Sequence, residues 1–463
     1  HFFKMSIMAW TAVILAAGKG TRMASCKPKA LQMLAGRTLI GHVLNTLDNL
    51  SIDEAVIIHS PEAKSDFEEE LIGRNNITYV EQKEALGTAH ALKTALPHVS
   101  TDNLLVLLGD VPLLSGFTIS KLQEEVKKND LVVLTGTVDN PSGYGRICKD
   151  PDGKPSAIIE ELDCDDEQRK IKEINSGIMA FKTSVAANLV GKIKPNTKKN
   201  EYYLTDAIEI AYHEGIQAST YSTSEEEVFG VNSKRDLAEA EKINRKNVTD
   251  KLMDNGVTII DPNRVDVRGK LSCGENVTID VNTVFVGDVT LGDNVTIAPF
   301  TIISNSVIGD GTSIHSHSNI DGADIGSSCN IGPYARIRPQ TKLEEGAKVG
   351  NFVETKNSVI GKGTKVNHLT YIGDAKIGEN ANIGAGTITC NYDGVNKHQT
   401  KIGNEVFIGS GVELVAPIEV ENGATVGAGS TVSKHVPADK LTIERSKQKT
   451  VDGWKRPTKK EEN

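Results

Sequence analysis

The sequence predicts three parts in order: an α/β domain, a long connecting helix and a parallel β-helix made of hexapeptide repeats. Three observations lead to this prediction. Short apolar segments alternate with segments of helical spacing in the first half, residues 233–255 are charged and helix-prone, and aliphatic residues recur at every sixth position in the second half. We therefore expect domains at residues 1–232 and 256–463, joined by a helix at residues 233–255.

The composition is that of an ordinary globular protein, with 38% hydrophobic and 24% charged residues among 463. The net charge of −9 argues against a general nucleic-acid-binding surface. No apolar run reaches the ~18 residues of a membrane span, and the first residues, His1 to Lys4, lack the apolar region of a signal peptide. Six cysteines without a C-x-x-C motif indicate a reducing cytoplasm and argue against a zinc site.

A glycine-containing loop follows the first predicted strand. Residues 11–15 form an apolar run typical of a buried parallel strand, and residues 16–23 continue as Ala-Ala-Gly-Lys-Gly-Thr-Arg-Met. Such a junction presents backbone N–H groups to anionic phosphates. The loop is not a Walker A motif, because no Gly-Lys-Ser/Thr follows at the required spacing, and it lacks the third glycine of a dinucleotide-binding motif. Taken alone, it is weak evidence for phosphate binding.

Helical and strand-like segments then alternate up to Asp110. We expect helices at residues 39–50 and 89–96, and strands at residues 55–58, 77–80 and 104–108. This order predicts a doubly wound sheet that binds its ligand outside the carboxyl ends of the strands. Asp110 follows the last of these strands, where a carboxylate can hold a magnesium ion between phosphates. The alternative is an aspartate that caps the next turn.

The second half carries the hexapeptide repeats. We expect one aliphatic and one small side chain of each hexad to point into the β-helix. A gap in the period around residues 389–394 predicts a loop that protrudes and serves binding. The alternative is a repeat scaffold without chemistry. The clearest run of aliphatic residues is Ile402, Ile408, Leu414, Val420, Val426 and Val432.

His368 is a candidate general base within the repeats. It follows inward-pointing Val366 by two residues, which places it on a coil edge or an outer face. An imidazole can take a proton from an amine nucleophile near neutral pH. The alternative is an exposed loop histidine, and we interpret His315 and His317 in that way.

A string that begins at Leu15 is more specific than its glycines alone. It reads Leu-Ala-Ala-Gly-Lys-Gly-Thr-Arg-Met and is followed by Lys27-Pro28-Lys29, which resembles the sugar-phosphate nucleotidylyltransferase family. The resemblance implies that the loop wraps a nucleotide and that Arg22 and Lys29 contact its phosphates. The alternative for Lys29 is a solvated surface lysine.

Further segments of that family occur in the expected order. Asp110, in Gly-Asp-Val-Pro, and Asn232, in Phe-Gly-Val-Asn, match the positions of the family's magnesium ligands. Within this resemblance Gln82, Gly87 and Thr88 would contact the uracil, while Gly145, Glu160 and Asn175 would lie at the sugar and its acetamido group. The implied nucleotide- and sugar-binding residues are Leu15, Ala16, Ala17, Gly18, Lys29, Gln82, Gly87, Thr88, Leu108, Gly109, Asp110, Gly145, Glu160, Asn175 and Asn232. The string at residues 200–206 also matches, and we assign it no role.

Three strings in the repeats extend the resemblance to nearly the whole chain. They are Gly-Asn-Phe-Val-Glu at residues 350–354, His-Leu-Thr-Tyr at residues 368–371 and Asn-Ile-Gly-Ala-Gly-Thr-Ile-Thr-Cys-Asn-Tyr-Asp-Gly at residues 382–394. With them, the chain resembles the family of bacterial bifunctional N-acetylglucosamine-1-phosphate uridylyltransferases/glucosamine-1-phosphate acetyltransferases. The resemblance implies a Rossmann-like α/β nucleotidylyltransferase domain joined by a long helix to a left-handed parallel β-helix, and a homotrimer.

The same resemblance implies the residues of an acetyl-transfer site. His368 would be the general base, and Glu354 would orient the histidine or the amine. Arg338 and Lys356 would hold the sugar phosphate, while Tyr371 and Asn382 would place the sugar. Acetyl-coenzyme A would be held by Ala385, Asn391, Tyr392, Ser410, Ala428 and Arg445.

The predicted function is therefore a pair of reactions. The second half acetylates glucosamine-1-phosphate with acetyl-CoA, and the first half transfers UMP from UTP to N-acetylglucosamine-1-phosphate, with Mg²⁺ as cofactor. The products are UDP-N-acetylglucosamine, used in building the cell envelope, and pyrophosphate. Two alternatives stay open: a single-activity nucleotidylyltransferase whose repeats serve assembly or regulation, and a non-catalytic binding scaffold. Lys29, Asp110 and His368 count against both.

Overall fold

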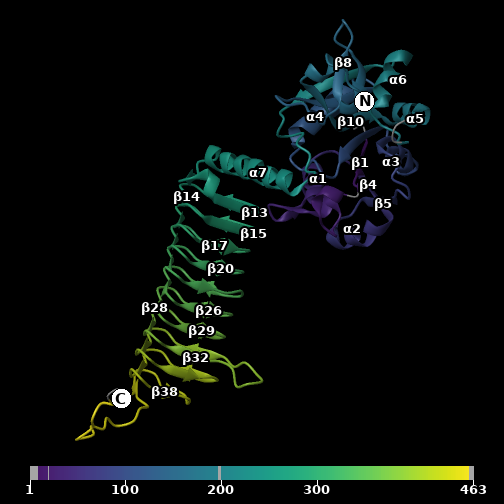
Figure 1. Cartoon of the computed structure of the whole chain (residues 1–463). Helices are drawn as coiled ribbons and strands as arrows, with labels where there is room; N and C mark the ends of the chain where they lie inside the picture. Colours follow the sequence, from purple (N-terminus) through teal and green to yellow (C-terminus); the bar gives the residue numbers. More distant parts are fainter. Residues whose placement is uncertain (1–8, 19, 197–199, 458–463) are drawn as a thin grey trace, which may run out of the picture. The chain divides into compact units, whose positions relative to one another are not determined.

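The computed structural model describes residues 9–18, 20–196 and 200–457, so the segment His1 to Lys4 lies outside the described residues. The chain divides into two compact units, residues 1–244 and 245–463 (Figure 1). The division falls within helix α7 (Lys234–Asp254), in the segment for which the sequence predicts a connecting helix. No helix in the described ranges is long and apolar enough to cross a bilayer.

The first unit is built on a mixed sheet with the strand order β11-β7-β10-β6-β1-β4-β5, to which β8 and β9 attach beside β10. Neighbouring strands on the main path are parallel, except that β10 runs antiparallel to β6 and β7. The predicted doubly wound sheet is confirmed. The strands are β1 (Trp10–Leu15), β4 (Glu54–His59), β5 (Ile77–Glu81), β6 (Asn103–Leu108), β7 (Leu131–Thr137), β8 (Arg146–Lys149), β9 (Pro155–Ile159), β10 (Glu173–Lys182) and β11 (Ala218–Thr223), beside a hairpin of β2 (Met33–Leu34) and β3 (Arg37–Thr38).

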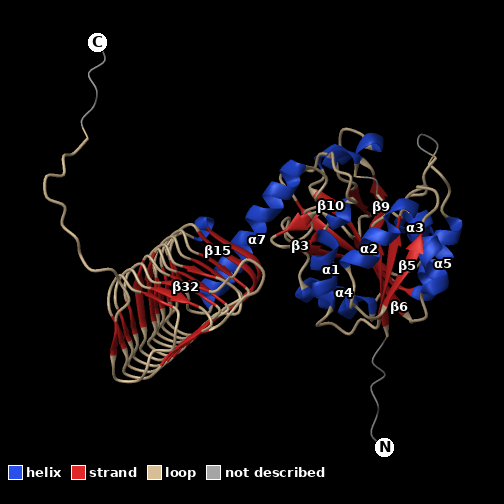
Figure 2. Cartoon of the chain, turned by 90° about the horizontal axis from the view of Figure 1, so that it is seen from below, coloured by secondary structure: helices blue, strands red, loops and turns tan. Residues whose placement is uncertain are grey.

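Helices cover both faces of this sheet, as Figure 2 shows. Successive residues of β1 point to opposite faces, so Ile14 joins the hydrophobic cluster of Ile40 and Leu122 while Val13 joins the cluster of Leu92. The helices are α1 (Leu39–Leu47), α2 (Lys64–Glu70), α3 (Thr88–Ala95), α4 (Gly116–Val126), α5 (Thr183–Lys192) and α6 (Asp206–Glu214). Helix α1 ends three residues before the predicted end at Leu50, because Asp48 and Asn49 favour turns over helix.

The second unit is a parallel β-helix with three rows of short strands. The first row consists of β12 (Thr258–Ile259), β14 (Thr278–Ile279), β16 (Thr296–Ile297), β19 (Ser313–Ile314), β22 (Asn330–Ile331), β25 (Lys348–Asn351), β28 (Lys365–His368), β31 (Asn382–Ile383), β34 (Phe407–Ile408), β37 (Thr425–Val426) and β39 (Leu441–Thr442).

The other two rows begin together in the long strands β13 (Val265–Cys273) and β15 (Thr283–Leu291). The second row continues as β17 (Ile302–Ser304), β20 (Asn319–Asp321), β23 (Arg336–Ile337), β26 (Glu354–Lys356), β29 (Tyr371–Gly373), β32 (Ile388–Cys390), β35 (Glu413–Val415) and β38 (Thr431–Val432). The third row continues as β18 (Val307–Ile308), β21 (Asp324–Ile325), β24 (Lys342–Leu343), β27 (Val359–Ile360), β30 (Ala375–Ile377), β33 (Thr400–Ile402) and β36 (Ile418–Val420).

The hexapeptide pattern produces the core of this unit. In β24, for example, Lys342 is exposed while Leu343 is fully buried, and small inward residues such as Cys329 and Ala335 are also buried. The β-helix extends beyond Val432, where the sequence predicts its end, because β39 pairs with β37. The next buried aliphatic residue after Val432 is Val436. Because it comes four positions later and not six, the six-residue period does not predict it.

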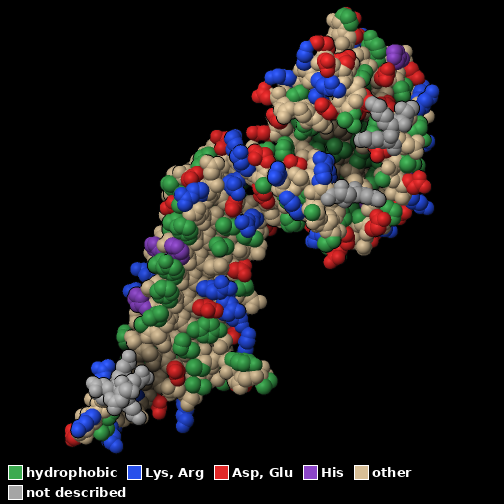
Figure 3. Space-filling view, viewed as in Figure 1, with side chains coloured by type: hydrophobic (Ala, Val, Ile, Leu, Met, Phe, Trp, Pro, Cys, Tyr) green, Lys and Arg blue, Asp and Glu red, His purple; other side chains and the backbone are tan. Residues whose placement is uncertain are grey.

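One edge of the β-helix carries a stack of exposed rings. Phe300, His317, Tyr334 and Phe352 occupy successive coils at the turn between the first and second rows, with centroid separations of 4.9, 4.7 and 5.3 Å. All four have positive φ angles, from 55 to 61°, and Leu369 continues the column. Figure 3 shows hydrophobic and histidine side chains exposed along one edge of the β-helix. Beyond Leu369 the same turn position is taken by Gly386, Gly411 and Gly429.

Leu343→Ala tests how far the stacked aliphatic interior stabilises the second unit. Leu343 is fully buried and lies in register between Ile325 and Ile360. We expect its truncation to leave a cavity and to lower the free energy of unfolding by about 2–5 kcal/mol. Chemical unfolding followed by circular dichroism measures this. The neighbouring exposed change Lys342→Ala should stay within about 0.5 kcal/mol, and equal effects of the two substitutions would contradict the inward assignment of Leu343.

Candidate functional site

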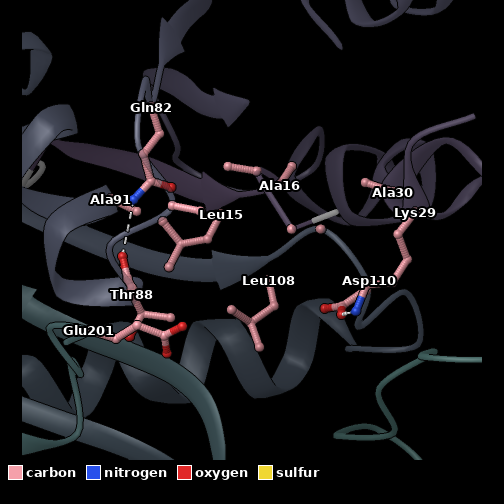
Figure 4. Close-up of a pocket in the computed structure, with 15 residues that line it drawn as sticks. Leu15, Ala16, Lys29, Ala30, Gln82, Thr88, Ala91, Leu108, Asp110 and Glu201 are labelled. Carbon is pink, nitrogen blue, oxygen red and sulfur yellow. Dashed lines mark hydrogen bonds and ion pairs between the residues drawn. The ribbon is translucent and has the colours of Figure 1, made fainter. Parts of the chain in front are cut away.

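A cavity of about 300 Å³ lies at the carboxyl ends of β1 and β6. Figure 4 shows Lys29 and Asp110 facing each other on one side, with Gln82, Thr88 and Glu201 on the other. The structure thus brings the predicted glycine loop, the Gln82–Thr88 segment and the end of β6 into one cavity. Its lining residues are Leu15, Ala16, Ala17, Gly18, Lys29, Ala30, Gln82, Ala85, Gly87, Thr88, Ala91, Leu108, Gly109, Asp110 and Glu201.

Two oxygen-bearing side chains converge on Lys29 at one end of this cavity. The Lys29 ammonium forms an ion pair with the Asp110 carboxylate, and its Nζ donates a 3.0 Å hydrogen bond to Asn232 Oδ1. Arg22 also donates to that oxygen, at 3.3 Å. Asn232 is held by its own hydrogen bonds, from its N–H to Asp236 and from Nδ2 to the Gly230 carbonyl. The side chains of Asp110 and Asn232, the two predicted magnesium ligands, thus both contact the Lys29 ammonium.

The predicted sugar-binding residues meet in an adjoining cavity of about 510 Å³ that shares Thr88 and Leu108 with the first. Glu160 and Asn175 line it, and a side-chain carbon at Gly145 would lie 3.5 Å from Glu160 Oε1 and 3.7 Å from Asn175 Cβ. Gly145 is not among the residues that line this cavity, and the atom nearest to such a side-chain carbon is Ile158 Cγ2, at 3.0 Å. Thr205 donates to Glu160 Oε1 at 3.3 Å and fixes the carboxylate.

In the second unit, His368 is exposed at the end of β28. Its Nδ1 lies 2.9 Å from Oδ1 of Asn351, which faces it from the preceding coil in β25. Because an amide oxygen can only accept, Nδ1 carries a hydrogen, and in the neutral imidazole Nε2 is then the nitrogen that can accept a proton. The imidazole is thus held in the tautomer that a proton acceptor requires.

Positive side chains gather beside His368 on the second row. Arg338 forms a 2.8 Å ion pair with Glu354, and the imidazole of His368 has Asn351 as its hydrogen-bond partner. The orienting role of Glu354 toward the histidine or the amine stays a prediction. The nearby Lys397 ammonium, together with partial burial, lowers the pKa of Lys356. The Asp374 carboxylate lies near both ammonium groups and offsets part of their repulsion.

The predicted protruding loop is confirmed between β32 and β33 (Figure 1). Asn391 at its base is buried and donates a 2.5 Å hydrogen bond to Asp374, whereas Tyr392 is exposed. A 2.7 Å hydrogen bond joins His398 Nε2 to the Asp393 carboxylate within the loop, and this bond holds the pKa of Asp393 well below its usual range. Asn391 therefore anchors the loop in the structure, while Tyr392 is presented outward.

A column of small residues runs along the first row from His368. The strand register places Ala385, Ser410 and Ala428 in successive coils at the position of His368. Arg445 closes the column by donating to the Ala428 carbonyl at 2.8 Å. Glycines occupy the neighbouring turn in these coils, so the run of bulky side chains at this turn ends at Leu369. Tyr371 and Asn382 lie beside the column, on β29 and β31.

Comparisons with known proteins cover nearly the whole chain. The MobA-like NTP transferase domain model matches residues 12–165, the GMPPB C-terminal domain model residues 267–343 and the bacterial transferase hexapeptide model residues 399–434. The "Bifunctional protein GlmU" of Francisella philomiragia is 46% identical over 98% of this chain and 100% of its own. The proteins of that name from Francisella tularensis subsp. novicida and Paraburkholderia xenovorans are 48% and 47% identical, over 98% and 97% of this chain and 99% of theirs. The chain belongs to the bifunctional GlmU family.

Membership in the GlmU family confirms the fold class and the function predicted from the sequence. The first unit is the nucleotidyltransferase and the second is the left-handed β-helical acetyltransferase. The chain acetylates glucosamine-1-phosphate and uridylylates N-acetylglucosamine-1-phosphate. Its substrates accordingly include acetyl-CoA and UTP.

Several site residues of this GlmU-family chain escape the sequence reasoning. Asn351 lies in a characteristic string, but its bond to His368 depends on the coil register. Lys397 approaches Lys356 only through the loop. Glu201 and Tyr203 line the two first-unit cavities from the string at residues 200–206, to which the sequence assigns no role. In each case the residue can be read from the sequence, but the group that it contacts cannot.

Asp206 is the last residue of that string, and its pKa is shifted. Burial raises its pKa to about 6 from an ordinary 3.8, and the charges of Glu209 and Glu160 add to this effect. The folded state therefore binds more protons than the unfolded chain between these two pH values, so Asp206 costs increasing stability as the pH rises through that window.

Asp206→Asn should remove this cost. We expect the first unit of the variant to unfold at a higher temperature than the parent above pH ~6, and at the same temperature near pH ~4, because the parent carboxyl is then largely protonated. Calorimetric scans at both pH values measure the difference. Asp66→Asn, an exposed acid in the first turn of α2, serves as a control that should not stabilise. A stabilisation of the Asp206 variant that is equal at both pH values would contradict the prediction.

Proposed function

We propose that the first-unit cavities are the uridylyl-transfer site of this chain and that the column beginning at His368 is its acetyl-transfer site. The proposal for the first site is supported by the convergence of Asp110 and Asn232 on Lys29. The proposal for the second is supported by the Asn351–His368 hydrogen bond, which leaves one imidazole nitrogen free to accept a proton.

In the first site, UTP occupies the cavity of Gln82, with its phosphates toward Arg22 and Lys29. N-acetylglucosamine-1-phosphate occupies the adjoining cavity beside Glu160 and Asn175. Its phosphate oxygen attacks the α-phosphorus, and pyrophosphate leaves with the bonding electron pair. The attacking phosphate is already anionic, so the site needs no strong base. It must hold the reactants in line and offset the charge of the leaving group.

The donor set fits a magnesium ion. Asp110 and Asn232 supply a carboxylate and an amide oxygen, and Mg²⁺ at phosphate-transfer sites is typically held by one or two protein oxygens with substrate phosphates and water completing its shell. No cluster of three or more His, Cys, Asp or Glu side chains suited to a metal occurs in the described ranges. When bound there, magnesium neutralises charge on the phosphates. Lys29 then contributes a charge-assisted hydrogen bond to a phosphate oxygen.

In the second site, Nε2 of His368 takes a proton from the amine of glucosamine-1-phosphate. As Nε2 takes this proton, the nitrogen attacks the thioester carbonyl of acetyl-CoA and forms the C–N bond. The C–S bond then breaks, and the coenzyme A thiolate leaves with the bonding electron pair and receives the proton from the imidazolium. Arg338 and Lys356, with Lys397 beside them, hold the sugar phosphate, and Glu354 fixes Arg338. Tyr371 and Asn382 place the sugar. Proton removal of this kind contributes about 10²–10⁴-fold to the rate.

The column of small residues takes the pantetheine arm of acetyl-CoA. Three coil steps separate His368 from Ala428, which at ~4.8 Å per step spans about 14 Å. Side chains no larger than serine leave room for a slender arm along this path. Tyr392 from the loop and Arg445 at the far end contact the nucleotide portion, while Asn391 anchors the loop through Asp374.

We also propose that the chain forms a homotrimer in the cytoplasm. The family resemblance supports three chains, and the exposed edge of Phe300, Tyr334, Phe352 and Leu369 is an apolar surface of the kind that association buries. The six free cysteines support a reducing compartment.

The two sites should be separable by single substitutions. We expect His368→Ala to lower acetyl transfer by at least about 10²-fold, because proton removal is lost, while uridylyl transfer stays at the parent level. Asp110→Ala should have the opposite effect, because the cation site loses its carboxylate. Separate assays of coenzyme A and pyrophosphate release measure both. If either substitution abolished both activities in a folded protein, the two-site assignment would fall.

Asn351→Ala tests the orientation of the imidazole. Without the bond to Asn351 Oδ1, His368 is free to rotate and to exchange tautomers, so we expect kcat for acetyl transfer to fall by about 3- to 10-fold. Asn330→Ala is the matched control, since Asn330 Oδ1 forms a 3.1 Å bond with His315 on the same face of the β-helix. Equal losses in the two variants would show that such pairs only stabilise the coils.

A further inference from the structure

The backbone carbonyl of Gly87 is a fixed acceptor at the edge of the first cavity. Gly87 has a φ of 99°, and a side-chain carbon there would lie 2.5 Å from the Tyr202 carbonyl oxygen. Only glycine fits this conformation and this close approach. The Tyr202 N–H donates to the Leu86 carbonyl at 2.7 Å, and the Ala89 N–H donates to the Tyr202 carbonyl at 2.9 Å, so both neighbouring segments are held.

Gln82 is oriented by this carbonyl and by a histidine. Its side-chain nitrogen lies 3.2 Å from the Gly87 oxygen and 3.0 Å from Nδ1 of His90 on α3. A carbonyl can only accept, so the atom of Gln82 that faces it must be the NH₂ group. It follows that Nδ1 of His90 is also an acceptor and that this imidazole is neutral, with its hydrogen on Nε2.

Both N–H groups of the buried Gln82 amide are thereby used within the protein. In the described part of the chain, no group donates to its oxygen. The dashed line in Figure 4 marks the bond to Gly87, and the oxygen of Gln82 lies on the side toward Leu15, which also lines the cavity. A base that reaches Gln82 therefore meets an acceptor and no donor.

We infer that His90 is a positioning residue for base selection, because it holds the Gln82 amide with its oxygen toward the nucleotide. Uracil carries a hydrogen on N3 and can donate to this oxygen. Cytosine has a lone pair at N3, so it would leave two acceptors facing each other. A buried acceptor left without a donor rejects the wrong ligand effectively. The inference rests on the proposed function, in which the base lies against Gln82.

Loss of His90 should weaken selection without abolishing it. In a His90→Ala protein, Gly87 still holds one N–H of Gln82, but the second has no acceptor. If the Gln82 amide rotates, it offers its NH₂ group to cytosine. In the variant this rotation breaks only the hydrogen bond to Gly87, whereas in the parent it breaks the bonds to both Gly87 and His90. The energy of about one neutral hydrogen bond corresponds to a 3- to 10-fold decrease in selectivity.

The experiment compares kcat/KM for UTP and CTP in the full-length chain. We expect His90→Ala to lower the UTP/CTP ratio by about 3- to 10-fold, and His90→Asn, which can present an amide oxygen to Gln82, to retain more of the ratio. In a double-mutant cycle, His90→Ala should have no further effect on the ratio when Gln82 is already alanine. His98→Ala, an exposed histidine close behind α3, is the matched control and should leave the ratio unchanged.

The outcomes separate this inference from the proposed function. If Gln82→Ala lowers the ratio and His90→Ala does not, the base site stands and the role of His90 is wrong. If Gln82→Ala leaves the ratio unchanged, the base does not lie against Gln82 and both fall. An equal decrease for UTP and CTP in His90→Ala would mean that the histidine only stabilises the fold, which also overturns the inference. Acetyl transfer by the same preparations reports the integrity of the chain.

Discussion

The acetyl-transfer half depends on the register with which one coil of the β-helix stacks on the next. Parallel pairing locks each strand to the strands above and below, and a slip of one residue would turn every inward aliphatic side chain outward. This register brings Asn351 to His368 across 17 residues. It also aligns Ala385, Ser410 and Ala428 in one column with the imidazole. Packing of the interior thus determines the geometry of the exterior.

The nucleotidyltransferase half depends on a different constraint, the common edge at which parallel strands end. β1 and β6 are neighbours, so the loop after Leu15 and the Gly109–Asp110 segment meet although they are far apart in sequence. The N–H of Val231 donates to the Asp110 carbonyl at 2.9 Å and fixes the segment that carries Asn232. The Lys29 ammonium contacts the side chains of both Asp110 and Asn232, and its positive charge offsets the negative charge of the Asp110 carboxylate.

Bulky residues occupy one turn of the β-helix in its earlier coils, and glycines occupy the same turn in its later coils. The turn position between the first and second rows has a positive φ in every coil considered, a conformation that costs little for glycine and more for an aromatic residue. Phe300, Tyr334 and Phe352 occupy it nonetheless, with ring stacking to offset the strain. In the coils of Gly386, Gly411 and Gly429 the position is glycine, so no side chain projects from this turn.

Features that depend on neighbouring residues are predictable from the sequence, whereas features that depend on distant residues are not. The strand before the glycine loop and the helix after Thr88 carry their own periodicity and were located to within a residue. The antiparallel β10 and the last coil, with Val436 as its inward residue, were missed, because neither keeps a local pattern. The bond between Asn351 and His368 could not be predicted either, because it joins residues on two successive coils.

The sequence by itself determined the two folds, their order and the family, because hydrophobic period, glycine placement and motif strings are properties of neighbouring residues. It also supplied the side chains of both sites. Only the tertiary structure decided which of them touch: that Asn351 sets the tautomer of His368, that Lys397 approaches Lys356 and that His90 orients Gln82. Those contacts depend on coil register, loop path and sheet order, and each of these follows from the energy of the whole packed unit.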